Sequence, residues 1–582
     1  MDIAGELRKG LGLHRDGRLA EAGDIYARVL EAEPDNADAL NLMGVVLQAA
    51  GDCVGAIGLL RRATELAPEY FAAHVNLGNA QQGAGRLEDA VCALQTAIRL
   101  NPDAPEALNN LASVLNGLGR HQEAEDACAR ALALAPRFAE ALNNLGNALI
   151  GLGRAEEAAQ NFQASLAIDA NSAEAHFNLG NALMDLGATR EAAASYGRAV
   201  DLDGDDTHKL YNLGNALRAL DRTEDAVDCY RRALEADPDN TDALNNLAAA
   251  CKDLGKLDEA RECYRRALSF EPDSADLHWN HSLVLLQSGE FAEGWREYEW
   301  RWRTPSFAHI LRDFEPPRWE GGDLSGKTIL VHAEQGFGDA IQFVRYAPMV
   351  AARGGRVVLE CRPGLERLFA GVEGVAEVVT LGAPLPPFDV HIPLMSLPRV
   401  FATELDTIPD AVPYLSLPAG AEAGDEITAA PGLKVGIVWA GSPTRPDNDK
   451  RSCEPGHFAP LMGIPGTTFF SLQVGEFAAG LRELEGEAVD LAPGLGDFAD
   501  TAAAVQALDL VISVDTAVLH LAGALARPAW GALSFATGFL WMQGRDDSPW
   551  YPTMRLFRQD APGDWEPVFR RLGRELEALA GA

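Results

Sequence analysis

The sequence lacks several features that mark common functional classes. Its 582 residues include 49 Lys and Arg against 85 Asp and Glu, which gives a formal net charge of −36 and an isoelectric point near 4.7. Nucleic acids and anionic membranes bind concentrated positive surfaces, so neither is an expected partner. The chain does not open with a basic stretch and an apolar run, and no segment reaches the roughly 18 apolar residues of a membrane span. A cytoplasmic location is expected.

Paired cysteines and familiar nucleotide motifs are missing as well. The eight cysteines, at 53, 92, 128, 229, 251, 263, 361 and 453, form no Cys-x-x-Cys pair. Neither a zinc site nor a disulfide framework is indicated, so reduced, mostly buried thiols are expected. The stretch "HAEQGFGDAIQFVRY", residues 332–346, has neither the Lys-Ser/Thr pair of a P-loop nor the third glycine of a dinucleotide fingerprint.

The first half of the chain does contain a repeat with a period of 34 residues. Small residues recur in this register without a slip, at Gly10, Gly44, Gly78, Ala112, Gly146, Gly180, Gly214, Ala248 and Ser282. A second small residue recurs at Ala22, Ala56, Ala90, Ala124, Ala158, Ala192, Ala226 and Ala260, and a proline closes most units. Small residues let paired helices approach closely, and proline ends the second helix. The pattern resembles the tetratricopeptide repeat (TPR), with eight complete units and a truncated ninth over residues 1–303, and it predicts an α-solenoid, a superhelix with a concave face.

One position in the repeat is more regular than the fold requires. An asparagine stands two residues before the small residue in seven successive units, at Asn76, Asn110, Asn144, Asn178, Asn212, Asn246 and Asn280, and four units add another three residues on, at Asn79, Asn147, Asn181 and Asn215. These amides either bridge neighbouring repeats or form a ladder that binds the backbone of an extended polypeptide. The stripe resembles the asparagine ladder of the eukaryotic O-GlcNAc transferases, which implies a polypeptide acceptor in the groove.

The second half alternates strands and helices. After a linker at 304–326, four strands are expected within residues 327–416, and after a second linker at 417–432 a further set begins, within 433–582. Two βαβ-type halves predict two doubly wound parallel sheets with ligands at the carboxyl ends of the strands, an α/β class. This arrangement resembles the GT-B glycosyltransferase architecture, which implies an acceptor-side half, a donor-binding half and a terminal helix near 564–580.

The stretch "DLVISVDTAVLHLAGAL", residues 509–525, predicts a buried strand, a turn at Asp515 and Thr516, and a helix whose free N–H groups can hold a phosphate. The competing interpretation is that the two side chains merely cap the helix. The stretch resembles the Asp-Thr-Gly-x-x-His motif of bacterial heptosyltransferases, with Ala517 in place of the glycine and His520 at the histidine. His520 is either part of the donor site or a core histidine.

Two further loops complete the expected site. In "SPTRPDNDKRS", residues 442–452, Lys450 and Arg451 are candidates for contact with the donor phosphates, as in related GT-B enzymes, or they are solvated surface charge. In the 332–346 stretch, Gly336 and Gly338 allow a close approach of the backbone. Asp339 matches the catalytic aspartate of the heptosyltransferases and is the candidate general base, unless it only caps the helix. Glu334 and His332 are reserve candidates, and no metal is expected.

Aromatic residues cluster at two places. Trp295, Tyr298 and Trp302 fall on one helical face at the end of the last unit, which favours a packed plug between domains over a ligand cradle. Residues 535–559 carry Trp541, Trp550 and Tyr551, which either frame a sugar or base or pack under the terminal helix.

The chain as a whole resembles bacterial TPR-linked protein O-glycosyltransferases of the flagellin glycosyltransferase type. That resemblance implies an inverting, metal-independent transfer from a nucleotide sugar, CMP- or UDP-linked and of the CMP-pseudaminic acid kind, to Ser or Thr of a polypeptide, with flagellin as the suspected acceptor. Two alternatives stay open. One is a glycosyltransferase acting on lipid or polysaccharide, and the other is a non-catalytic TPR scaffold with a degenerate second half.

Overall fold

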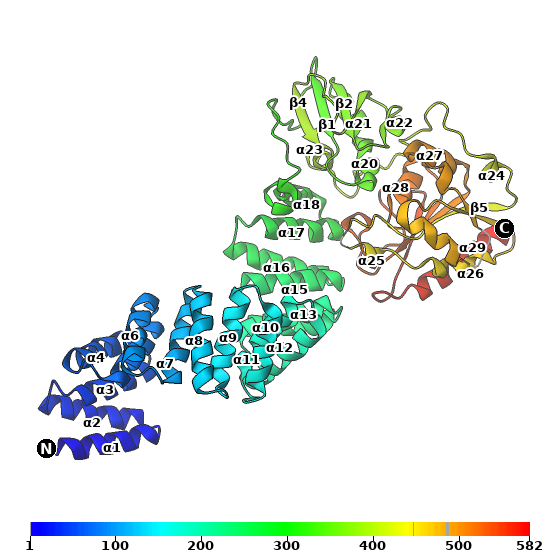
Figure 1. Cartoon of the computed structure of the whole chain (residues 1–582). Coiled ribbons are helices and arrows are strands. Elements are labelled where there is room, and N and C mark those ends of the chain that lie inside the picture. The colour runs from blue at the N-terminus through cyan, green and yellow to red at the C-terminus, as the bar shows by residue number, and fades with distance from the viewer. Residues whose placement is uncertain (1, 446, 485–487, 582) are drawn as a thin grey trace. The chain divides into compact units, whose positions relative to one another are not determined.

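The structure, a computed structural model, describes residues 2–445, 447–484 and 488–581. Pro446, in the loop predicted to contact the donor, and residues 1 and 582, at the ends of the predicted domains, lie outside the described residues. The chain forms two compact units, one up to Pro238 and one from Asp239 onward. Figure 1 shows helices throughout the first unit, and helices together with two sheets in the second.

The 34-residue period corresponds to pairs of antiparallel helices. In the first unit these are α1 (Ile3–Arg15), α2 (Leu19–Ala32), α3 (Ala37–Ala49), α4 (Cys53–Leu66), α5 (Phe71–Gly83), α6 (Leu87–Leu100), α7 (Pro105–Gly117), α8 (His121–Leu134), α9 (Ala139–Gly151), α10 (Ala155–Leu166), α11 (Ala173–Asp185), α12 (Thr189–Asp203), α13 (Thr207–Ala219) and α14 (Thr223–Ala236). The second unit begins with α15 (Thr241–Asp253), α16 (Leu257–Phe270), α17 (Ala275–Ser288) and the short α18 (Phe291–Glu297), followed by a 3-10 turn, η1 (Tyr298–Arg303). The predicted TPR solenoid, with its shortened last repeat, is confirmed.

The small residues are needed because a large side chain of the second helix lies against each of them. A Cβ added at Gly146 would lie 2.4 Å from Cε1 of Phe162, and one added at Gly180 would lie 2.5 Å from Cε1 of Tyr196. The same pairing, sixteen residues apart, recurs at Gly44 with Leu60. The predicted close approach of the paired helices is therefore confirmed.

The second unit contains two parallel sheets. The first has the order β3-β2-β1-β4, with β1 (Thr328–His332), β2 (Arg356–Cys361), β3 (Val375–Thr380) and β4 (Val390–Pro393). The second has the order β10-β9-β8-β5-β6-β7, with β5 (Leu433–Val438), β6 (Thr467–Ser471), β7 (Ala488–Asp490), β8 (Leu510–Val514), β9 (Ala529–Leu533) and β10 (Met554–Arg558). The first nine strands were predicted and are confirmed, and β10 was missed.

Short helices connect the strands. They are α19 (Pro305–Ala308), α20 (Phe337–Phe343), η2 (Val344–Tyr346), α21 (Ala347–Ala351), α22 (Glu366–Phe369), η3 (Leu394–Ser396), α23 (Leu397–Val400), α24 (Asp425–Thr428), α25 (Asn448–Arg451), η4 (Pro455–Phe458), α26 (Ala459–Met462), η5 (Gly475–Glu483), η6 (Ala492–Gly494), α27 (Phe498–Ala507), α28 (Ala517–Ala524), η7 (Phe539–Trp541) and α29 (Glu566–Gly581). The terminal helix α29 is confirmed and packs its apolar face on the second sheet and α26.

One apolar core joins the last repeat to both halves of the second unit. Trp295 and Tyr298 are buried in it, and the Trp295 ring lies 5.8 Å from both Phe343 of α20 and Phe539 of η7. The prediction that these two rings form a packed plug is confirmed. Trp302 remains partly exposed. The last repeat is thus continuous with the core that supports the loops at the ends of the strands.

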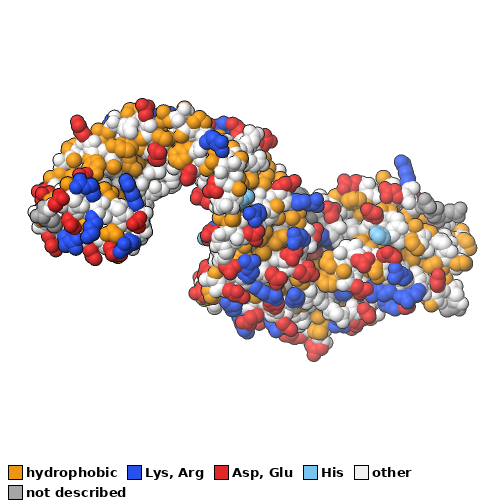
Figure 2. Space-filling view, turned by 90° about the horizontal axis from the view of Figure 1, so that it is seen from below, with side chains coloured by type: hydrophobic (Ala, Val, Ile, Leu, Met, Phe, Trp, Pro, Cys, Tyr) orange, Lys and Arg blue, Asp and Glu red, His pale blue; other side chains and the backbone are white. Residues whose placement is uncertain are grey.

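Surface features agree with the composition. Six of the eight cysteine side chains are buried, as expected for mostly buried thiols. Acidic side chains are spread over the face seen in Figure 2, with basic side chains between them. Among the residues that the structure describes, no helix is both long enough and apolar enough to cross a membrane.

Candidate functional site

Asp339 lies in the first turn of α20, directly after the central strand β1. Its Oδ2 accepts a hydrogen bond of 3.0 Å from the N–H of Gly336, so it does stabilise the start of the helix. The side chain is half-buried. Burial raises its pKa above the ordinary range and Asp515 also raises it, while the positive charges of Arg445 and Arg451 oppose the rise. A carboxylate with a raised pKa is a stronger base than an exposed one.

The second turn follows β8, the central strand of the other sheet. Thr516 is the N-cap residue of α28 but makes no side-chain hydrogen bond to a helix amide. Its hydroxyl lies 2.8 Å from that of Ser513, which itself donates to the carbonyl of Val514, so Thr516 is the donor in this pair. The N–H groups of the first turn, at Ala517 and Val518, are therefore not capped by Thr516 and suit an anion.

These two turns, carried by different sheets, lie against one another. A Cβ added at Gly338 would lie 2.9 Å from Cδ2 of His520 and 3.6 Å from the Cα of Ala517. Figure 1 shows α20 and α28 between the two sheets. The glycine is required by this contact, which brings the Asp339 turn to the amino end of α28. The carboxyl ends of the central strands of both sheets meet there, as expected for ligand sites in parallel α/β folds.

His520 is buried among aromatic rings. Its Nδ1 lies 3.0 Å from the Tyr551 hydroxyl, its ring is stacked 4.9 Å from that of Trp541, and its Nε2 lies 4.0 Å from Asp515 Oδ1. Burial lowers its pKa to about 4, so the imidazole is neutral near pH 7. A neutral ring supports the turn and offers no positive charge to a phosphate.

The 442–452 loop brings positive charge to the same place. Arg451 pairs with Asp515 (3.1 Å) and also donates to its carbonyl oxygen, whereas Lys450 is exposed. Arg445, which sequence reasoning did not select, is about half-exposed and pairs with Asp447 at 3.0 Å. That hydrogen bond is the main cause of its raised pKa, and Asp515 and Asp339 add to the rise, so Arg445 lies within electrostatic reach of both. The sequence signal that could have indicated Arg445 is its position in the 442–452 loop.

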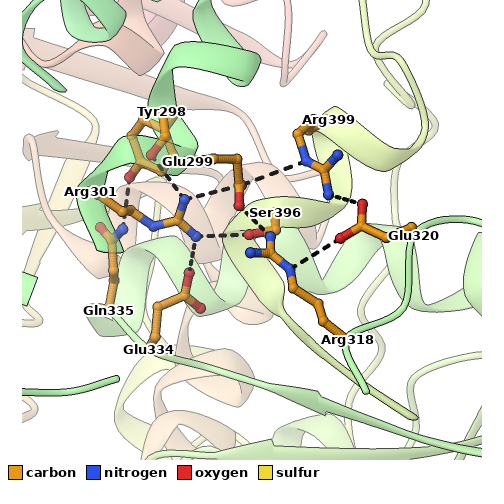
Figure 3. Close-up of polar contacts among 9 residues, drawn as sticks. All are labelled: Tyr298, Glu299, Arg301, Arg318, Glu320, Glu334, Gln335, Ser396 and Arg399. Atoms are coloured by element: carbon orange, nitrogen blue, oxygen red, sulfur yellow. Dashed lines mark hydrogen bonds and ion pairs between the residues drawn. The ribbon is translucent and has the colours of Figure 1, made fainter. Parts of the chain in front are cut away.

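The reserve candidates have other roles, and Figure 3 shows the contacts of Glu334. Glu334 is buried and accepts a hydrogen bond of 3.0 Å from Arg301, which is fully buried and also donates to Glu299 (3.1 Å) and Ser396 (2.9 Å). His332 is buried on the other side of β1, where its Nε2 lies 3.3 Å from His391 Nδ1, and burial lowers its pKa well below the usual value. Neither side chain meets the α28 turn, so the structure does not support either as the base.

The three large aromatic side chains of residues 535–559 lie in the core. Trp541, Trp550 and Tyr551 are buried in the core that includes the last repeat, where they pack against His520, Phe291 and Phe343. The terminal helix α29 belongs to a different cluster and contacts β10 at the end of this segment. The interpretation that the segment packs under α29 is therefore confirmed for β10 and not for the three rings, and contact of the rings with a sugar or base stays a prediction.

The asparagine stripe bridges neighbouring repeats. Five of the seven predicted asparagines donate from Nδ2 to an asparagine Oδ1 of the preceding repeat, at 2.8 to 3.1 Å: Asn76 to Asn41, Asn110 to Asn79, Asn144 to Asn109, Asn178 to Asn143 and Asn280 to Asn245. Asn212 donates to the His208 carbonyl, and Asn246 accepts from Asn245. All seven are partly exposed, and in the five that bridge, one N–H is used and the rest of the amide can still bind a ligand. In each Asn-Asn doublet, the first asparagine accepts the hydrogen bond from the next repeat. This residue is the sequence signal for bridging that was missed.

No cluster of three or more His, Cys, Asp or Glu side chains with metal-binding geometry occurs among the described residues. Asp447, which forms an Asp-x-Asp sequence with Asp449, is paired with Arg445.

Comparisons with known proteins agree with both parts of the structure. Tetratricopeptide repeat families match residues 7–71, 75–139, 146–187, 173–206, 211–275 and 252–298, and glycosyltransferase family 9 (heptosyltransferase) matches residues 473–531. The chain is similar to Protein FlbA of Caulobacter vibrioides, with 30% identity over 334 residues, which cover 52% of this chain and 55% of FlbA. The chain thus spans about half the length of the curated relative that it matches.

Several solved structures are similar to part of the chain. They include the APC/C Cut9–Hcn1 hetero-tetramer (18% identity, 46% of this chain and 52% of that one, TM-score 0.38) and MamA (28% identity, 28% and 96%, TM-score 0.26). Another is YrrB, described as a TPR protein with an unusual peptide-binding site (24% identity, 32% and 95%, TM-score 0.27). The family matches and the fold together show TPR repeats that lead into an α/β part with parallel sheets and a glycosyltransferase-like segment.

Proposed function

We propose that the protein is a GT-B protein O-glycosyltransferase, which transfers a sugar from a nucleotide donor to Ser or Thr of a polypeptide held by the repeats. The observation that carries the proposal is the contact of Gly338 with His520, which sets the Asp339 carboxylate turn opposite the uncapped amides of α28. An inverting transfer needs a base on the acceptor side and stabilisation of the leaving phosphate on the donor side.

In this mechanism the residues have separate tasks. Asp339 removes the proton of the acceptor hydroxyl, and its raised pKa suits that step. The α28 amides and the guanidinium groups of Arg445 and Arg451 bind the phosphate of the departing nucleotide, so no metal is required. The partly exposed asparagine amides hold the backbone of the acceptor regardless of its side chains. By the resemblance of the whole chain, flagellin is the proposed acceptor and a CMP-linked nonulosonic acid the proposed donor.

The competing function is that of a non-catalytic TPR scaffold. What favours it is that family 9 matches only residues 473–531, and that Ala517 stands where the heptosyltransferase motif has glycine. The two functions differ at Asp339, since a scaffold does not need this carboxylate.

The test is the intact mass of flagellin from cells with the wild-type gene, a deletion, and Asp339→Asn. We expect flagellin to lose the same mass in both mutants, and the difference identifies the sugar class. A loss in the deletion alone supports the scaffold. Unchanged mass in all three strains rejects flagellin, and the repeats are then used to capture another polypeptide.

A further inference from the structure

The second helix of each repeat carries a large residue at one register position, and in several repeats it is a tyrosine. Tyr26, Tyr196, Tyr230, Tyr264 and Tyr298 occupy this position, at separations that are multiples of 34 residues. All five are buried, and the first three of them lie against the glycine of their own repeat. The hydroxyl of such a buried tyrosine needs a partner, because an unpaired polar group in the core is unfavourable.

Two of the earlier repeats supply that partner themselves. The Tyr196 hydroxyl donates to Asn181 Oδ1 at 2.8 Å, and the Tyr230 hydroxyl donates to Asn215 Oδ1 at 2.7 Å. Both asparagines lie fifteen residues before the tyrosine, on the first helix of the same repeat. The side-chain oxygens of both asparagines are therefore engaged within the repeat.

The last repeat differs at this point. The residue fifteen positions before Tyr298 is Leu283, which has no polar group to offer. The Tyr298 hydroxyl instead accepts a hydrogen bond of 2.7 Å from Nε2 of Gln335, in the loop between β1 and α20 (Figure 3). The tyrosine hydroxyl of the last repeat is thus bonded to the loop that carries Asp339, and not to an asparagine of its own repeat.

Gln335 is held from a second direction as well. Its carbonyl oxygen accepts a bond of 2.6 Å from Arg362 Nε, in the segment that follows β2. The next residue is Gly336, whose N–H binds the Asp339 carboxylate. Glu334, on the other side of Gln335, pairs with Arg301 of the last repeat. A displacement of Gln335 would therefore move the N–H group that orients Asp339.

We propose that Tyr298 is a positioning residue for the transfer reaction: the last repeat, through the Tyr298–Gln335 hydrogen bond, fixes the turn that holds Asp339. This inference rests on the proposed function for its catalytic consequence, and the contact itself stands independently of it. The Tyr298 ring is also held by Trp279 (4.9 Å), Trp295 (5.5 Å) and Phe539 of the donor-side half (5.8 Å), so its hydroxyl has one fixed position. The electrostatic effect of Asp339 on the Tyr298 pKa places the two groups near each other.

The first test uses amide hydrogen exchange on the full chain, read by mass spectrometry in peptides covering residues 333–346. Tyr298→Phe keeps the ring and removes the hydroxyl, and we expect exchange in these peptides to rise roughly five- to tenfold, the effect of one lost hydrogen bond. Tyr196→Phe and Tyr230→Phe are matched controls that remove the same hydroxyl elsewhere, and they should leave the peptides unchanged. Gln335→Leu should act like Tyr298→Phe, and the double variant should add nothing to either.

The second test measures CMP release from CMP-pseudaminic acid in the presence of purified flagellin. Tyr298→Phe should lower kcat roughly tenfold and leave the KM for flagellin unchanged, whereas Tyr196→Phe should change neither. If the wild-type protein releases no CMP, the proposed donor or acceptor fails, and the exchange data alone decide the contact. Two results for Tyr298→Phe would overturn the inference. Unchanged exchange in residues 333–346 would mean that the hydroxyl does not hold the loop. Faster exchange throughout the second unit would mean that the hydroxyl only stabilises the fold.

Discussion

The contact between Gly338 and His520 makes a quantitative prediction for Gly338→Ala. The new Cβ would lie 2.9 Å from His520 Cδ2, about 0.5 Å short of the 3.4 Å at which ordinary contact begins. The imidazole cannot easily retreat, because its ring is stacked on Trp541 and its Nδ1 is held by Tyr551. Such overpacking costs about 1–3 kcal/mol. Alanine is favoured over glycine in a helix by about 1 kcal/mol, so a net loss of up to about 2 kcal/mol is expected.

Tryptophan fluorescence during urea unfolding is the suitable assay. All ten tryptophans lie at or beyond Trp279, so the signal reports the second unit alone. Gly322→Ala is the matched control, because a Cβ there meets nothing within 4 Å. A half-ångström displacement between the base and the donor site should also lower transfer about tenfold. In a His520→Ala background Gly338→Ala should cost almost nothing. Equal stability and activity of Gly338→Ala and wild type would refute the proposed geometry of the site.

Three further predictions concern pH, the repeats and metals. Burial raises the pKa of Asp339 and the charge of Arg445 lowers it, and the base is lost as the pH falls through the pKa of Asp339. Arg445→Gln should therefore raise this pKa and move the acid limb of the kcat/KM profile to higher pH. An acid limb that does not move argues against Asp339 as the base. Asn178→Ala removes the bond to Asn143 and should destabilise the repeats by about 1 kcal/mol in thermal unfolding followed by circular dichroism, and an unchanged midpoint contradicts the bridging role. EDTA should leave transfer rates unchanged; a loss restored by Mg²⁺ would show a metal requirement.

The parts of the fold that depend on period were predictable. A 34-residue repeat fixes the helix pairs, because each needs a small residue facing a large one. Apolar runs between turn residues fixed the buried strands of both sheets. The strand β10 was missed because "MRLFR" is a short edge strand with charged residues at two of its five positions, so it has no buried run.

The site was predictable only where local sequence determines it. Asp339 and Thr516 follow strands and start helices, which a pattern can indicate. The contact of Gly338 with His520, the reach of Arg445 and the bond of Gln335 to Tyr298 depend on how elements far apart in the sequence are placed, and no local signal encodes them. The replacement of an asparagine by Leu283 in the last repeat is the exception, since it shows in the register alone.

The boundary at Pro238 has a consequence for exchanging modules. The repeats up to this residue form a compact unit of their own, whereas α15 and α16 belong to the second unit and α17 and α18 share a core with the sheets. A chimera that receives a foreign recognition array should therefore be joined at residue 238, with the last two repeats retained as part of the recipient. Recombination at that junction can change which polypeptide is recruited, while every side chain that touches the Asp339 loop is inherited unchanged.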